Sequence, residues 1–318
     1  MHRAAKHAVQ FAERHSLIRR RMKTSLVAFV TAASAGLLAI SSTAQWPPYA
    51  TPNVPRKADG TPDLASPAPR AADGHPDLSG LWEIYFDTIV ARNTPPQGPP
   101  PAPGDDPSDG LPPRAPEPAP GTPPLATFFD IGGNMPDGLP FRPWARELRE
   151  QRMAANQKDN PDAHCLPMGY MQLHGHPQPR KIVQTPKLVI IMYEGNSGLR
   201  QIFLDGRSLP EIGPDLQPWW YGYSIGRWEG DTLVVESTGF RDDGWLDVFG
   251  SPLTDQGRII ERFRRPDYGH LEIDVTIDDP KAYTEPFTVR VNHQVMLDTD
   301  LIEFVCNENE KSVQHFDE

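Results

Sequence analysis

The chain has 318 residues, of which 37 are proline, and only 38% of its residues are hydrophobic. The part that folds around an apolar core is therefore smaller than the length alone suggests. A formal net charge of −11 argues against nucleic acid or an anionic membrane as the main partner, so we expect no nucleic-acid partner.

The first 44 residues, 1–44, have the pattern of a cleavable signal peptide. A basic run at 19–23 precedes an apolar stretch at 25–40, and the small residues at 42–44 form a cleavage site. The apolar stretch is shorter than the about 20 residues that a membrane-spanning helix requires. We therefore expect a periplasmic or secreted protein with no integral membrane segment after cleavage.

Cys165 and Cys306 are the two cysteines of the chain. In an oxidising compartment two cysteines in one chain usually pair, and we expect a disulfide here. Closing a loop of that length contributes about 4 kcal/mol in the chain-entropy model. A catalytic thiol is the alternative, but it would need a nearby base and a reason to stay reduced.

Residues 45–78 are polar and rich in proline, and we expect an extended segment there. The sequence RKADGTPDL at 56–64 recurs as RAADGHPDL at 70–78, and each copy contains an Asp-Gly turn followed by a proline. Only the second copy leads into an apolar strand. We place this strand within 79–93, as the first strand of the folded domain.

Residues 94–126 are dominated by proline, glycine and alanine. Such a segment cannot bury enough apolar surface to offset its ordering entropy, so we predict a disordered insertion. The remaining residues, 127–318, are predicted to form one helix and a β-barrel domain.

Helix-forming residues follow Pro143, which stands at a position that proline tolerates, and they predict a helix over 143–155. Most of the remaining chain alternates between apolar and polar side chains, as strands with one buried face do. The predicted strands span 79–86, 187–194, 199–204, 219–229, 232–240, 258–264, 270–277, 287–291 and 301–305.

The stretch at 219–240 is the clearest hairpin, because Gly230 and Asp231 join two alternating runs and glycine supplies the positive φ of a tight turn. Pairing Glu229 with Thr232 separates the side chains onto two faces. One face carries Ser224, Gly226, Trp228, Leu233, Val235 and Ser237. The other carries Tyr223, Ile225, Arg227, Val234, Glu236 and Thr238.

About nine or ten strands joined by hairpins make a sheet that tends to close or curl, because closure removes its exposed edges. We therefore predict a mainly β fold. Its form is an antiparallel up-and-down β-barrel or a strongly curled sheet, with one helix and the long proline-rich insertion.

Several motifs carry a resemblance to known proteins. Gly80-Leu81-Trp82 resembles the Gly-x-Trp signature in the first strand of lipocalin-like barrels. The longer motifs are PDLSGLW at 76–82, CLP at 165–167, RQIFLDGR at 200–207, GYSIGRWEGDTLVVE at 222–236, ERF at 261–263 and EFVCNEN at 303–309. On these motifs, which span most of residues 76–310, the chain is similar to a family of uncharacterised secreted bacterial proteins. The resemblance implies export and a single β-rich domain, and it implies no particular activity.

Candidate ligand-binding side chains lie on the hairpin and in the loops beside it. Arg227 and Glu236 are diagonal neighbours across two strands. Inside a barrel, the arginine would bind an anionic ligand and the glutamate, with its pKa raised by burial, would act as a base. The alternative is an ordinary ion pair on the solvent face. The predicted ligand-binding residues are Arg207, Trp220, Tyr223, Arg227, Glu236, Trp245 and Asp247.

His174 and His176 are the best pair of metal-ligating side chains, since alternating histidines can converge on one ion. A protein site for zinc needs at least a third ligand, which the sequence does not place, and the surrounding prolines favour exposed histidines in a loop. We predict no metal site and no cofactor.

The predicted function is the binding of a small apolar or aromatic ligand in or at the mouth of the barrel, where loop aromatics suit such a partner. One alternative is a cofactor-independent lyase, isomerase or hydrolase that uses Glu or His as base and Arg207 or Arg227 as anion site. Another is a structural or interaction protein of the cell envelope without a pocket. Whether the chain is an enzyme stays open. A carboxylate and a histidine within hydrogen-bond reach in a pocket would favour catalysis.

Overall fold

The computed structural model describes residues 49–84, 121–213, 215–306 and 308. The predicted signal peptide and residues 94–120 of the predicted insertion lie outside these described residues. A compact unit begins at Ala50.

The helical elements are α2 (Pro143–Ala154), the 3₁₀ helices η2 (Pro161–His164) and η3 (Gly195–Ser197), and the short helix α3 (Tyr170–Gly175). The strands are β1 (Gly80–Ile84), β2 (Arg180–Thr185), β3 (Leu188–Tyr193), β4 (Leu199–Phe203), β5 (Tyr223–Glu229), β6 (Thr232–Thr238), β7 (Gly244–Trp245), β8 (Pro252–Leu253), β9 (Arg258–Arg264), β10 (His270–Asp278) and β11 (Phe287–Val295).

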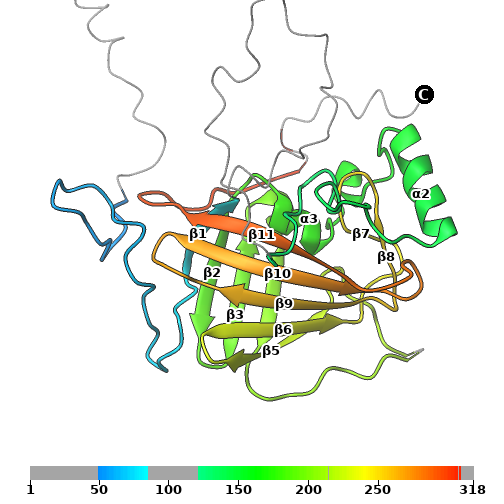
Figure 1. Ribbon diagram of the computed structural model, residues 1–318. Helices are drawn as coiled ribbons and strands as arrows, with labels where there is room; N and C mark the ends of the chain where they lie inside the picture. The colour runs from blue at the N-terminus through cyan, green and yellow to red at the C-terminus, as the bar shows by residue number, and fades with distance from the viewer. Residues whose placement is uncertain (1–48, 85–120, 214, 307, 309–318) are drawn as a thin grey trace, which may run out of the picture. The chain divides into compact units, whose positions relative to one another are not determined.

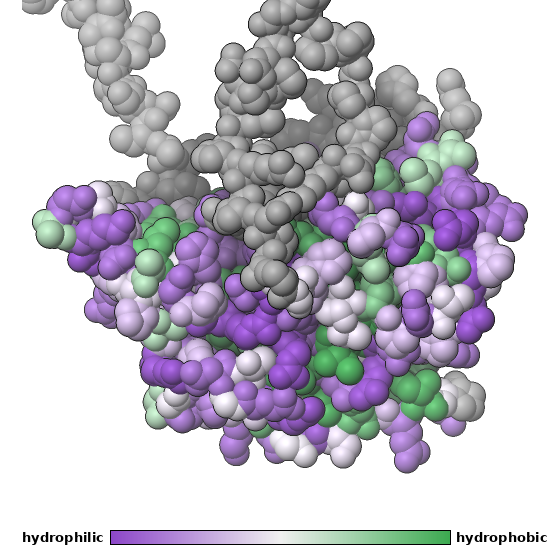
Figure 2. Space-filling view, viewed as in Figure 1, coloured by the Kyte–Doolittle hydropathy of each residue, from purple (hydrophilic) through white to green (hydrophobic). Residues whose placement is uncertain are grey.

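The main sheet is a closed barrel with the strand order β1-β11-β10-β9-β6-β5-β4-β3-β2, and β7 pairs with β8 separately. The predicted mainly β barrel is therefore confirmed. In Figure 1, β11, β10, β9, β6 and β5 form the wall nearest the viewer, with β2 and β3 behind it. Side chains alternate in and out along each strand, as in β10, where every second residue is buried. Figure 2 shows mainly hydrophilic residues on the near wall, with apolar residues between them.

Three details of the predicted topology are wrong. β4 and β5 pair in parallel, so the barrel is not up-and-down throughout. β2 was not predicted, because its sequence RKIVQT has only two apolar residues. Residues 301–305 form no strand, since this segment crosses loops at one end of the barrel instead of pairing with its wall.

The β5–β6 hairpin has the predicted register, from Tyr223 opposite Thr238 to Glu229 opposite Thr232. Gly230 adopts the positive φ of +61° that the turn needs. The face that carries Leu233 and Val235, both 0% exposed, points into the barrel core. This hairpin is therefore a folding element, and its charged face lies outside the barrel.

The two ends of the barrel are closed differently (Figure 1). At one end, here called the Trp82 end, the guanidinium of Arg265 lies 4.8 Å from the ring of Trp82. Arg265 also donates to the carbonyls of Asp77 and Tyr268, which ties the chain leading into β1 to the β9–β10 loop. The opposite end, here called the α3 end, is covered by α3, the β7–β8 sheet and α2.

The repeated sequence of the N-terminal segment forms the same turn twice. In each copy the amide of the second residue donates to the carbonyl of the sixth at 2.9 Å. The second copy is seated on the β5–β6 turn, where Arg70 donates to both carboxylate oxygens of Asp231 at 2.6 Å. His75 stacks on Trp228 with ring centroids 4.5 Å apart. This contact helps to cover the Trp82 end.

The predicted helix is α2, and its bounds agree with the prediction to within a residue. Residues 124–126, which were predicted to end the disordered insertion, pair instead with β11: the amide of Ala126 donates to the carbonyl of Arg290 at 2.8 Å. Ala126 is 3% exposed, so this short segment belongs to the folded domain.

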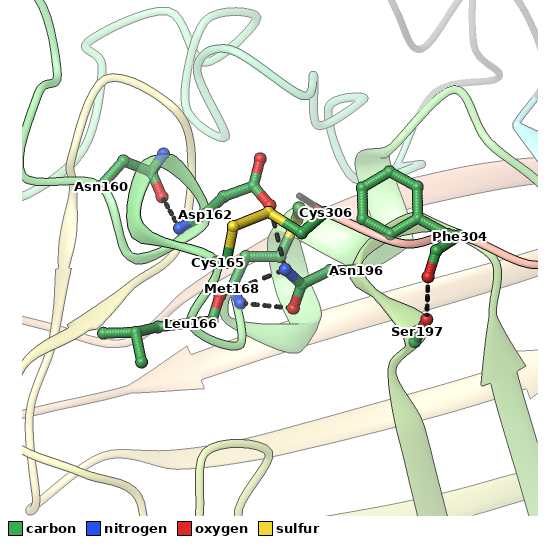
Figure 3. Close-up of a disulfide and its surroundings, with 9 residues drawn as sticks. All are labelled: Asn160, Asp162, Cys165, Leu166, Met168, Asn196, Ser197, Phe304 and Cys306. Atoms are coloured by element: carbon green, nitrogen blue, oxygen red, sulfur yellow. Dashed lines mark hydrogen bonds between the residues drawn. A yellow bond between two sulfur atoms is a disulfide. The ribbon is translucent and has the colours of Figure 1, made fainter. Parts of the chain in front are cut away.

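Cys165 and Cys306 form a disulfide with a Cα–Cα distance of 5.7 Å, as predicted. The bridge ties the C-terminal segment to the η2–α3 connection at the α3 end (Figure 3). Asn196 in the β3–β4 turn strengthens the same junction, because its side chain donates to the carboxylate of Asp162 at 3.0 Å and accepts from the amide of Met168 at 3.2 Å. The segment that leads into α3 is therefore held from two sides.

Candidate functional site

All six residues of α3 are buried, and this helix brings polar groups into the barrel. Its close approach to the β7–β8 loop requires glycine at 169, because a β-carbon there would collide with the carbonyl oxygen of Trp245. His174, in the last turn of α3, has only 1% of its surface exposed. Helix α3 therefore fills the barrel at this end, where a hollow barrel would hold a ligand.

The centre of the barrel holds an ion pair between Arg200 on β4 and Glu261 on β9. Nη1 of Arg200 donates to Oε1 of Glu261 at 2.9 Å, and Nη2 contacts Oε2. The guanidinium also donates to Ser224 at 3.2 Å and to Ser237 at 3.0 Å. Burial by itself would raise the pKa of Glu261, but Arg200 and the hydrogen bond from His174 lower it to about 2. Glu261 is therefore a carboxylate at neutral pH.

His174 completes this central cluster. Its Nε2 lies 2.8 Å from Oε1 of Glu261, and the hydroxyl of Tyr193 lies 3.3 Å from its Nδ1. Burial lowers the pKa of His174, so the ring is neutral at pH 7, with Nε2–H donating to Glu261 and Nδ1 accepting from Tyr193. The side chains of His174 and Glu261 are 1% and 0% exposed, so solvent does not reach the pair.

A second polar group lies between β2 and β11. Arg180, 1% exposed, donates to the carbonyls of His174 at 2.6 Å, His176 at 2.7 Å and Gln178 at 2.9 Å. These are carbonyls at and beyond the C-terminus of α3, where a cation is favourable. Arg180 therefore fixes the end of α3, and burial lowers its pKa to about 10. The neighbouring His293 is also buried, and burial holds its pKa well below the usual range.

A pocket lies at the α3 end, where α3 meets the β6–β9 connection, and is called the mouth pocket here. It is lined by Pro161, Pro167, Gly169, Tyr170, Met171, Trp220, Phe240, Arg241, Gly244, Trp245, Leu246, Leu253 and Ile259. The lining is almost wholly apolar, with Arg241 as its one charged residue. Its enclosed space is about 10 Å³, which is room for one water molecule.

Arginines cover both tryptophans of the mouth pocket. The guanidinium of Arg241 lies 4.3 Å from the ring of Trp220, and that of Arg152 lies 4.2 Å from the ring of Trp245. Trp245 is 2% exposed and is held by the β7–β8 pairing. Trp220 lies in the long connection between β4 and β5, most of whose residues around 205–219 are exposed. Trp220 is thus a partly exposed wall of the pocket that belongs to a mostly exposed connection.

Of the predicted ligand-binding residues, the structure brings Trp220 and Trp245 together in this pocket. Asp247 lies nearby in sequence but is 0% exposed. Its carboxylate accepts from the amides of Ile131 and Ser251 at 3.0 Å and from the Ser251 hydroxyl at 2.7 Å. Asp247 therefore organises the loop that carries Trp245 and is not presented to a ligand.

The other predicted residues lie on the outer wall, which corrects the proposed interior site. Arg227 has a 63% exposed side chain and pairs with Glu229 at 2.8 Å. Glu236 pairs instead with Arg258 at 2.8 Å. Successive side chains of a strand point to opposite faces of the sheet. Because the apolar face of the hairpin packs in the core, its charged face points outward.

Arg207 and Tyr223 lie together on the outer wall beside β4 and β5. Arg207 stacks on the ring of Phe203 at 3.8 Å, chelates Asp205, and donates to the Tyr223 hydroxyl at 3.1 Å. Its side chain is 42% exposed. These residues form a surface cluster apart from both the central cluster and the mouth pocket.

His174 and His176 have separate partners. His174 binds Glu261, whereas His176 packs edge-on against Phe128 and accepts from the amide of Gln178 at 3.2 Å. Among the residues that the structure describes, no group of three or more His, Cys, Asp or Glu side chains could hold a metal ion.

The central cluster was missed as a site, although a signal for it exists. In β9 the inward positions read Ile259, Glu261 and Phe263, so one carboxylate interrupts an apolar face. Arg200 similarly shares the buried face of β4 with Ile202. A charge on an apolar strand face indicates a buried partner, but the sequence alone does not say which strand supplies it.

Comparison of the chain with protein-family models, with curated proteins and with solved structures found no match. Within the described part of the chain, no helix has the length and apolar composition needed to cross a bilayer.

Proposed function

We propose that this protein binds a small, predominantly apolar or aromatic ligand at the mouth pocket of its β-barrel. The observation that carries the proposal is the lining itself: Tyr170, Trp220, Phe240 and Trp245 converge at the one end of the barrel where α3 meets loops. Apolar and aromatic linings with few polar groups are typical of small-molecule sites.

The ligand enters by displacing Trp220. The enclosed space of about 10 Å³ is far below the ~300 Å³ typical of a site for a drug-sized molecule. Trp220 is the movable wall, because it is only half-buried and belongs to an exposed connection. The other walls belong to α3 and to the β7–β8 loop, which the disulfide and Asp247 hold in place.

Binding is favoured over catalysis by the position of the central cluster. His174 and Glu261 are within hydrogen-bond reach of each other, but neither lines the mouth pocket, and both are closed to solvent. A general base must come within hydrogen-bond distance of the proton that it removes. The pair therefore acts as an internal brace between α3 and the barrel wall.

We further propose that the protein acts outside the cytoplasm. The disulfide between Cys165 and Cys306 supports this location, since disulfides persist mainly in oxidising compartments. Cell fractionation of the tagged full chain tests it. Recovery of the tag in the cytoplasm with reduced cysteines would contradict it.

The binding proposal is tested with the full oxidised chain, by mass spectrometry of co-purifying compounds and by a thermal-shift screen of aromatic and terpenoid-like compounds. A bound compound should also change tryptophan fluorescence. We expect Trp220→Phe to remove much of that change, because the phenyl ring keeps the wall but not the indole signal. Trp219→Phe is the matched control on the same connection, outside the pocket lining. If no compound is retained and none raises the melting temperature, the proposal fails.

A further inference from the structure

Arg241 is the charged group of the mouth pocket, and its hydrogen bonds leave part of its guanidinium available. Nε donates to Oδ1 of Asp243 at 2.9 Å, and Nη2 donates to Oδ2 at 3.0 Å. Asp243 therefore occupies the Nε–Nη2 edge. Among the described residues, none accepts a hydrogen bond from Nη1, so the Nη1–Nη2 edge is open. This second edge can bind another carboxylate in a bidentate fashion.

The open edge is held in a defined orientation. The guanidinium lies 4.3 Å from the ring centroid of Trp220, and its two hydrogen bonds to Asp243 set its orientation. The Arg241 side chain is 38% exposed, so a ligand at the rim can reach it. Asp243 keeps this hold on the guanidinium when Trp220 moves, and a planar fork that is already oriented loses little conformational entropy when it binds an anion.

The surrounding charges do not oppose an anion at this position. Asp243 is already paired with Arg241, and Asp242 is bound to Lys281 at 2.6 Å, which also binds Asp255 at 3.1 Å. Arg152, which covers Trp245, has no carboxylate partner within salt-bridge distance among the described residues, and its Nη1 donates to the carbonyl of Gly250. Arg241, Lys281 and Arg152 together match the three aspartates of the rim, so no net negative charge opposes an anion there.

From this geometry we infer that the ligand of the mouth pocket is an aromatic or apolar carboxylate whose anionic group binds the open edge of Arg241. The inference rests on the proposed function, because it assigns a chemical class to the ligand of the same pocket. The apolar part of the ligand packs on Trp220 and Phe240, and the carboxylate stays at the rim, where it keeps part of its hydration.

The chain contains a matched control for Arg241. Arg207 also chelates an aspartate two residues away and also stacks on an aromatic ring, at 3.8 Å from Phe203. Its Nη1, however, donates to the Tyr223 hydroxyl, so its second edge is taken. It also lies on the outer wall, away from the mouth pocket. Arg207→Gln removes the same charge without touching the proposed site.

The test uses a pair of probes that differ in charge and little else, 2-naphthoate and 2-naphthamide, titrated into the oxidised full chain with calorimetry and tryptophan fluorescence. The naphthoate should bind about 10- to 100-fold more tightly, as expected for a charge-assisted bidentate hydrogen bond. Arg241→Gln should remove this preference while the amide still binds. Arg241→Lys should keep only part of it, because an ammonium is a point charge without a planar fork. Arg207→Gln should leave it unchanged.

Three results would overturn the inference and leave the proposed function standing. One is equal affinity for the two probes in the natural chain, and another is an unchanged preference in Arg241→Gln. Loss of the preference in Arg207→Gln to the same extent would also overturn it, because a general loss of positive charge would then explain the effect. If neither probe, nor any other compound in the screen, binds the folded natural chain, the proposed function fails and the inference fails with it.

Discussion

The central ion pair allows a quantitative prediction about stability. Replacing Glu261 by glutamine keeps the shape of the side chain but leaves the guanidinium of Arg200, which is 2% exposed, without its counter-ion. Removing one partner of a buried ion pair costs about 3–5 kcal/mol, because the remaining charge stays buried and uncompensated. That is a large part of the ~5–15 kcal/mol that separates most folded domains from their unfolded states.

The assay is urea unfolding of the oxidised protein at pH 7, followed by tryptophan fluorescence. With a slope of roughly 3 kcal/mol/M, a loss of about 4 kcal/mol lowers the midpoint by more than 1 M. Glu236→Gln is the control, since it removes the same charge from the exposed pair with Arg258 and should cost at most about 1 kcal/mol. The double variant Glu261→Gln with Arg200→Met should be more stable than Glu261→Gln alone. Equal losses for Glu261→Gln and Glu236→Gln would refute the reasoning.

Three further predictions concern acid, the disulfide and a glycine. Burial, together with the charge of Arg180, lowers the pKa of His176 to about 4 from its ordinary 6.5. The stabilisation that comes from burying the neutral His176 ring is therefore complete above pH 6.5 and is lost as the pH falls to 4. The free energy of unfolding, measured with urea at pH 7 and at pH 4, should fall by about 3 kcal/mol from this group. His176→Asn should show a smaller fall, and an equal fall in both proteins would contradict the prediction. Cys306→Ser opens a loop whose ends are 141 residues apart and should cost about 2–5 kcal/mol in the same assay, whereas unchanged stability would show that the bridge constrains nothing. Gly222→Ala places a β-carbon 2.5 Å from the ring of Phe240 at a φ of +67°, whereas Gly206→Ala meets only the backbone strain of a φ of +83°. Gly222→Ala should therefore lower the melting temperature more than Gly206→Ala. Similar melting temperatures of the two variants would argue against the close packing at Gly222.

The local pattern of the chain was enough to predict many of its elements. The register of the β5–β6 hairpin follows from Gly230 and from the alternation on either side of it, because both depend only on neighbours in sequence. The start of α2 at Pro143 is local in the same sense, since proline at that position needs no distant partner. The pairing of Cys165 with Cys306 was also predictable, because two cysteines allow one intramolecular bridge.

The candidate site was predictable only in part. Trp220 and Trp245 were expected near a mouth because aromatic residues in loops beside a barrel suit an apolar ligand, and both line the pocket. Arg227 and Glu236 had two possible positions, because a two-faced hairpin leaves open which face meets the core until the other strands are placed; both side chains lie on the solvent face, each with a different partner.

The sequence by itself determined that this chain forms a mainly β domain, where its hairpins turn, and which side chains share a strand face, since each depends on residues a few positions apart. Only the tertiary structure decided that β4 and β5 run parallel, that Arg200 meets Glu261 from strands 61 residues apart, and that α3 fills the barrel. These features arise when strands distant in sequence close into one wall. The free energy of closing the barrel depends on whether each buried charge has a partner in the interior, and this cannot be predicted from neighbouring residues in the sequence.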